Sequence, residues 1–153
     1  MNYIEAPSYS YNPAKMGPHK SIFLAGGITN CPNWQTDMAY LLSDTHLTIL
    51  NPRRSHFPIH DKNAAFEQIK WEYKHLHLAT AILFWFPEET LCPIVLYELG
   101  SWSPTTKPIF VGIHPNYARR QDVEIQTQLA RPETRIAYIL NELADQVISW
   151  TTD

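Results

Sequence analysis

The chain has 153 residues, of which 44% are hydrophobic and 18% charged, so it is long enough to fold around one hydrophobic core. Its net charge of -3 argues against a nucleic-acid polymer or an anionic membrane as partner, since both bind basic surfaces. The two cysteines, Cys31 and Cys92, form no CxxC motif and predict neither a disulfide framework nor a metal site. Without a signal-peptide pattern or an apolar run of about 18 residues, we expect a soluble, cytoplasmic protein with reduced thiols.

The chain then divides into an arm and a domain. Residues 1–18 are rich in Pro, Tyr and Ser without periodicity, which predicts a flexible N-terminal arm, and residues 19–153 predict a single catalytic domain. Short apolar runs predict strands at residues 21–28, 46–50, 81–86, 108–113 and 134–139. Apolar residues at helical spacing predict helices at residues 32–43, 62–79, 93–102, 120–130 and 140–150. In the second of these helices the predicted apolar stripe consists of Phe66, Ile69, Tyr73 and Leu76.

Strands that alternate with helices, and that are too apolar to face water, predict an α/β fold with a parallel sheet of about five strands flanked by helices. In such sheets the ligand lies beyond the carboxyl ends of the strands. These ends carry Gly26-Gly27, Asn51 to Arg54, Pro87 to Glu89 and His114 to Asn116. The helix that follows the third strand begins at Pro93 on the same edge, and it carries Glu98.

Two glutamates stand beside apolar residues without a nearby cation. Glu98, in "LYELGSW", has no lysine or arginine one helical turn before or after it, and neither has Glu72 in "IKWEYKHLH". Either could pair with an arginine distant in sequence or extend into water, as most single glutamates do. Two such carboxylates near one ligand crevice also suit chemistry at the anomeric carbon of a sugar, with one as nucleophile and the other as the group that transfers a proton.

Four motifs together resemble the nucleoside 2-deoxyribosyltransferase family: "IFLAGGI", "ILNPRR", "ILFWFPEET" and "YELG", over residues 21–114. The resemblance implies a flavodoxin-like sheet, no cofactor, and cleavage of the N-glycosidic bond of a 2′-deoxynucleoside through a covalent deoxyribosyl-glutamate with retention. Glu98 then matches the nucleophile, and Glu72 matches an acidic position, more usually aspartate, that aids proton transfer. The family often has a further acid before the nucleophile; here those positions read Leu91 to Pro93, so that Glu88 or Glu89 substitutes or sugar recognition differs.

The residues expected to bind the substrate are Gly26, Gly27, Ile28, Asn30, Asn51, Arg53, Pro87 and Glu88. Arg53 and Arg54 are candidates to hold a 5′-phosphate, although two loop arginines are more often solvated or structural. Trp34 or Phe57 could stack on a base, with core packing as the other reading, and the histidine spacings indicate no metal site.

We therefore expect a nucleoside 2′-deoxyribosyltransferase whose partners are a nucleoside and a free nucleobase. The alternatives are a hydrolase of deoxynucleosides or their 5′-monophosphates that uses the same Glu98, and a non-catalytic nucleotide-binding module on the same scaffold. The resemblance also implies a homo-oligomer in which a neighbouring subunit completes the active site. The sequence leaves open the choice between purine and pyrimidine and the size of the oligomer.

Overall fold

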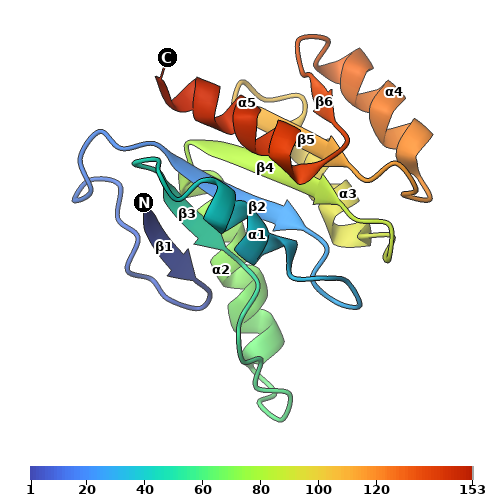
Figure 1. The fold of residues 1–153 in the computed structure, drawn as a ribbon. Coiled ribbons are helices and arrows are strands. Elements are labelled where there is room, and N and C mark those ends of the chain that lie inside the picture. Colours follow the sequence, from blue (N-terminus) through green and yellow to red (C-terminus); the bar gives the residue numbers. More distant parts are fainter. Residues whose placement is uncertain (153) are drawn as a thin grey trace.

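The computed structural model describes residues 1–152 and contains one six-stranded parallel sheet covered by helices (Figure 1). The strands are β1 (Asn2–Glu5), β2 (Ser21–Gly26), β3 (Thr48–Asn51), β4 (Ala81–Phe86), β5 (Ile109–Ile113) and β6 (Ile136–Ala137). The helices are α1 (Trp34–Leu41), α2 (Ala64–Leu78), α3 (Pro93–Trp102), α4 (Arg120–Ala130) and α5 (Leu140–Thr152). No helix within residues 1–152 has both the length and the apolar character needed to cross a membrane.

The strand order is β1-β3-β2-β4-β5-β6, and every neighbouring pair is parallel. Without β1, this is the order of a flavodoxin-like sheet, whose chain runs outward to one side after its first strand and then to the other. The predicted fold class is confirmed. The direction of winding reverses between β2 and β4, so their carboxyl ends form the position where such folds bind ligands.

The two central strands are buried over their whole length, because helices cover both faces of the sheet. On one face Phe23, Phe84 and their neighbours pack with buried residues of α2, α3 and α4. On the other face Leu24, Trp85 and their neighbours pack with α1 and α5. Trp34 of α1 is 3% exposed within this second cluster, so it is a core residue.

The segment expected to be a flexible arm begins with a β-strand. Asn2–Glu5 forms the edge strand β1, which pairs with β3 so that Ile4 lies opposite Leu50. Further along the arm, the buried Tyr11 donates a hydrogen bond through its hydroxyl to Ser21 Oγ at 2.7 Å. The sheet consequently has six strands, where about five were predicted, because backbone pairing with β3 orders a segment that lacks any apolar period.

The predicted apolar stripe of the second long helix is wrong for three of its four residues, since only Leu76 is buried. Phe66, Ile69 and Tyr73 of α2 are 65%, 65% and 67% exposed, while Trp71 and His75 are fully buried. The Trp71 and His75 rings stack at 4.0 Å between centroids, and the Trp71 indole N–H donates to Ser8 O at 2.7 Å. Burying the large indole with its N–H satisfied rotates α2 and leaves three apolar side chains on the surface.

Candidate active site

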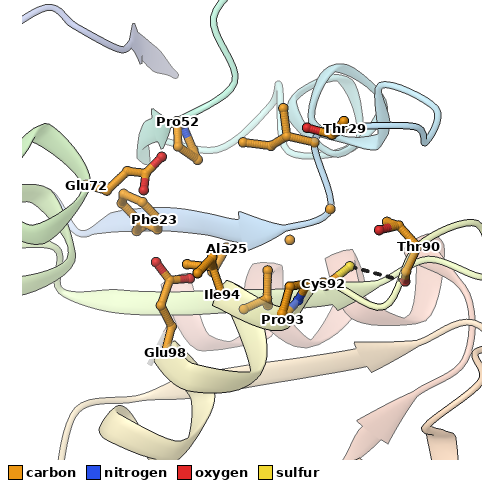
Figure 2. A pocket seen from close by; sticks show the side chains of 14 residues that line it. Phe23, Ala25, Thr29, Pro52, Glu72, Thr90, Cys92, Pro93, Ile94 and Glu98 are labelled. Atoms are coloured by element: carbon orange, nitrogen blue, oxygen red, sulfur yellow. Dashed lines mark hydrogen bonds between the residues drawn. The ribbon is translucent and has the colours of Figure 1, made fainter. Parts of the chain in front are cut away.

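A cavity of about 370 Å³ opens at the carboxyl ends of β2 and β4, where the winding of the sheet reverses (Figure 2). It lies between the loop after β2, the residue that follows β3, the middle of α2 and the first two turns of α3. Its lining residues are Phe23, Ala25, Gly26, Gly27, Ile28, Thr29, Pro52, Glu72, Thr90, Cys92, Pro93, Ile94, Val95 and Glu98. Most of them are apolar, and the two glutamates are the ionisable carboxylates among them.

The two glycines after β2 bring the backbone close to its neighbours. A Cβ on Gly26 would lie 2.2 Å from Trp34 Cζ2, and a Cβ on Gly27 would lie 2.8 Å from Pro87 Cγ. The Gly27 carbonyl accepts hydrogen bonds from Trp34 Nε1 at 2.9 Å and from Gln35 Nε2 at 3.1 Å. The first turn of α1 therefore holds this backbone in place, and the missing side chains leave room that no other residue type would leave.

The start of α3 is set by its own local sequence. Pro93 occupies the first turn, where its missing N–H costs nothing, and Cys92 precedes it with a left-handed φ of 51°. The Tyr117 hydroxyl donates to Leu91 O at 2.7 Å and ties the preceding loop to the β5 side of the sheet. Burial raises the pKa of the Cys92 thiol to about 12, so this side chain is a neutral group in the cavity wall.

The two glutamates enter the cavity from different helices. Glu72 comes from α2 and Glu98 from the second turn of α3, and Figure 2 shows both carboxylates directed into the space beside Phe23 and Ala25. Burial, with the neighbouring charge of Glu72, raises the pKa of Glu98 to about 8. Burial also raises the pKa of Glu72, although a hydrogen bond from Gln68 opposes the rise. Within residues 1–152 no ion pair or hydrogen bond satisfies the Glu98 carboxylate.

Half of the ten predicted site residues line this cavity: Gly26, Gly27, Ile28, Glu72 and Glu98.

Asn51 and Arg53 do not line the cavity, because their side chains make hydrogen bonds elsewhere in the chain. The Asn51 amide donates to the Tyr3 hydroxyl and to Arg53 O, and its oxygen accepts from Arg53 N at 2.9 Å. The guanidinium of Arg53 donates to the carbonyls of Pro32 and Cys31 and to the Gln35 side chain. Arg53 thus holds the loop after β2 through three hydrogen bonds of its guanidinium.

The remaining predicted residues also lie outside the cavity lining. Asn30 is an exposed loop residue with φ of 57°, and Pro87 packs against Gly27. Glu88 accepts a hydrogen bond from Asn116 Nδ2 at 3.0 Å and lies 3.7 Å from His114 Nε2. Its carboxylate is therefore engaged at the end of β5, and neither it nor Glu89 is among the residues that line the cavity.

Sequence reasoning missed several apolar lining residues. Ile94 and Val95 stand four and three positions before Glu98, so helical spacing places them on the same side of α3 and could have identified them. Phe23 lines the cavity from within β2, and nothing in the sequence distinguishes it from the other apolar residues of that strand. No cluster of three or more His, Cys, Asp and Glu side chains in residues 1–152 is arranged to hold a metal ion.

A protein-family model described as nucleoside 2-deoxyribosyltransferase like matches residues 19–117, which is more than half of the chain. The chain belongs to this family. The matched region contains β2 to β5 with α1 to α3 and therefore includes the whole cavity lining. None of the curated proteins matches the chain. The resemblance read from the sequence motifs is thereby confirmed at the level of the family.

Proposed function

We propose that the protein is a nucleoside 2′-deoxyribosyltransferase in which Glu98 is the nucleophile and Glu72 the proton-transfer group. The observation that supports this most is the pair of carboxylates, Glu72 and Glu98, that share one largely apolar cavity with no cationic lining residue. In such surroundings a carboxylate interacts strongly with the positive charge that develops on a sugar ring as its glycosidic bond breaks. A 2-deoxy sugar reaches that state readily, since it lacks the electron-withdrawing 2′-hydroxyl.

The reaction proceeds in two displacements. An ionised Glu98 oxygen attacks C1′ of the deoxynucleoside, and the electrons of the C1′–N bond pass to the departing base, which takes the proton of Glu72. A second base then attacks C1′ through its nitrogen, Glu98 leaves as a carboxylate, and the proton of the incoming base returns to Glu72. Two inversions at C1′ give net retention. Burial raises the pKa of both carboxyls, so the pair holds the exchanged proton more tightly than exposed glutamates would. The cycle requires this proton to be on Glu72 when Glu98 attacks.

The cavity favours a neutral nucleoside over a nucleotide. No lysine or arginine is among its lining residues, and Arg53 is occupied by loop carbonyls. A phosphate dianion would therefore meet two acidic groups without a compensating cation. The side chain of Arg54, whose Nη1 is buried without a partner within residues 1–152, lies outside the cavity lining.

The experiment that tests this function is a base exchange followed by chromatography. The protein is incubated with 2′-deoxyinosine and adenine, beside Glu98→Gln and the matched control Glu67→Gln, whose side chain lies on α2 outside the cavity. New 2′-deoxyadenosine with wild type and control, and none with Glu98→Gln, supports the transferase. Free hypoxanthine without a new nucleoside would establish a hydrolase instead, and binding without any turnover would establish a binding module.

We also propose that a second copy of the chain covers the exposed apolar surface of α2 and α3. This surface forms a groove of about 590 Å³, and its largest apolar members are Ile69, Tyr73, Ile94, Tyr97 and Trp102. Ile94 and Tyr97 are 64% and 76% exposed, which is unusual for neighbouring apolar side chains on a monomer. Glu72, Ile94 and Glu98 line both this groove and the cavity, so a partner seated here would close the active site.

The oligomer is tested by light scattering after size-exclusion chromatography. Tyr97→Glu places a charge in the groove and is expected to yield smaller species with reduced transfer. Leu129→Glu is the matched control, because Leu129 is 80% exposed on α4, outside the groove. A wild-type protein that elutes as a monomer at all concentrations would refute the assembly.

A further inference from the structure

Gln68 lies one helical turn before Glu72 on α2 and uses its side-chain amide to hold that carboxylate. Its Nε2 donates to Glu72 Oε1 at 2.8 Å and to Pro52 O at 2.7 Å, so both amide hydrogens are engaged. Pro52 follows β3 and lines the cavity. A single side chain thus connects the sheet edge to one of the two acidic groups.

The orientation of this amide follows from its two partners. A flipped amide would direct Gln68 Oε1 at the Pro52 carbonyl and the Glu72 carboxylate, both of which are acceptors. In the observed orientation Oε1 of Gln68 is buried and has no hydrogen-bond partner within residues 1–152. Leaving such an acceptor unpaired costs about 1–3 kcal/mol. The Gln68 side chain accordingly adopts the orientation in which its N–H groups donate to Glu72 and Pro52, although its own oxygen then accepts no hydrogen bond.

We propose that Gln68 is a positioning residue that decides which oxygen of Glu72 carries the exchanged proton; this rests on the proposed function. The Gln68 N–H occupies one acceptor site of Glu72 Oε1 and makes this oxygen less basic than Oε2, so the proton occupies Oε2. In the first displacement that Oε2–H bond breaks as the leaving base gains an N–H bond. In the second, the N–H bond of the incoming base breaks and the proton returns to Oε2. Without the amide, both oxygens would compete for the proton and the carboxyl would rotate.

The groups around Glu72 allow this hydrogen bond to have a measurable effect. Glu98 of α3 is the other carboxyl of the cavity, and the thiol of Cys92, whose pKa burial raises to about 12, also lines it. From the sheet, β2 contributes Phe23 and Ala25 and the end of β3 contributes Pro52. The cavity lining within residues 1–152 supplies no cation to compensate the charge of Glu72. The Gln68 donor stabilises the ionised form of Glu72 against burial. Its removal should raise the pKa of Glu72 and move the basic limb of the pH profile upward.

Gln68→Met tests the proposal, because methionine keeps the shape of the side chain and lacks the donor. We expect kcat to fall about tenfold. This is less than the roughly 100-fold or greater acceleration that a general acid contributes, because Gln68→Met leaves Glu72 itself in place. KM should stay within about twofold, and the basic limb of kcat should move to higher pH, a change that a purely structural role would not produce. Lys70→Met, at an exposed position of the same helix, is the control and should leave kcat, KM and the pH profile unchanged. Gln68→Leu serves as a second variant if Gln68→Met does not fold.

A second measurement is independent of turnover. Side-chain ¹³C NMR of labelled glutamate, with Glu72→Gln used for assignment, follows the titration of Glu72 in the free protein. We expect its midpoint to rise in Gln68→Met. If wild type transfers deoxyribose but Gln68→Met matches Lys70→Met in kinetics and titration, this inference alone is overturned. If wild type transfers nothing while the midpoint still rises, the proposed function fails and the catalytic part of this inference fails with it.

Discussion

Replacing Glu98 by glutamine should remove activity and yet stabilise the protein at alkaline pH. The pKa of Glu98 lies above its unfolded value, so the folded protein binds this proton more tightly than the unfolded chain does. The associated stability is fully present below about pH 4.5 and is lost as the pH rises through about 8. Glutamine keeps the size and hydrogen-bonding capacity of the protonated form but never acquires the charge.

The size of the effect follows from the two pKa values. The difference between about 8 and the ordinary 4.5 sets a ceiling of about 5 kcal/mol, at 1.36 kcal/mol for each pKa unit. Glu98 is only partly buried, and solvent screening reduces this ceiling, so we expect a gain of roughly 1–2 kcal/mol at pH 9. For a chain of this size, that gain corresponds to an increase in Tm of roughly 2–8 °C.

Urea unfolding at pH 5 and pH 9, at one fixed protein concentration, provides the assay. The free energies of unfolding of wild type and Glu98→Gln should differ less at pH 5 than at pH 9, because the loss of wild-type stability begins near pH 4.5 and continues through about pH 8. Groups that titrate in the same way in both proteins cancel in the difference. Glu67→Gln should show a difference from wild type that does not vary between the two pH values. An equal or lower stability of Glu98→Gln at pH 9 would refute the reasoning that Glu98 is buried without a compensating cation.

Three further predictions concern the cavity walls. Gly26→Ala should lower the free energy of unfolding by about 3 kcal/mol in thermal or urea unfolding, because its Cβ would overlap the Trp34 ring, whereas Gly100→Ala, with no atom within 4 Å, should be neutral or stabilising; equal effects would contradict this. Glu72→Gln should reduce transfer from 2′-deoxyinosine about 100-fold or more, and much less from a 4-nitrophenyl deoxyriboside, whose leaving group needs no proton; equal losses would argue against proton transfer. Arg53→Met should raise KM several-fold with little change in kcat in steady-state assays, since the loop after β2 loses two hydrogen bonds and Gln35 of α1 loses a third; an unchanged KM would show that other contacts hold the loop.

Local sequence patterns were sufficient for the central architecture and for the two acidic groups. The apolar runs that form β2, β4 and β5 are buried on both faces of the sheet. A short, continuously apolar run is typical of a central strand in a parallel sheet with helices on both sides. Glu72 and Glu98 could be singled out because helical spacing reveals the absence of a cation within one turn. That both would face one cavity followed from the general position of ligand sites in parallel α/β sheets.

Other features depended on residues far apart in the chain. β1 forms because its backbone pairs with β3, some 46 positions later in the chain. The residues of β1 show no alternation of apolar and polar side chains that would predict this pairing. Arg53 and Asn51 were predicted to contact substrate, yet hydrogen bonds to loops and to Tyr3 occupy them within the chain.

The orientation of α2 about its own axis shows most clearly which features depend on tertiary contacts. Its sequence offers an apolar stripe at Phe66, Ile69, Tyr73 and Leu76 and, on another side, the pair Trp71 and His75. Helical period alone cannot choose between two such faces, since both satisfy the spacing. Tertiary contacts select the buried face: Phe23 of β2 packs against the indole, and the segment between β1 and β2 provides the Ser8 carbonyl that accepts its N–H. The sequence by itself determined which helices and strands form and which two carboxylates lack a neighbouring cation. Tertiary packing determined which face of each helix is buried against the sheet, because that choice depends on contacts between residues far apart in the chain.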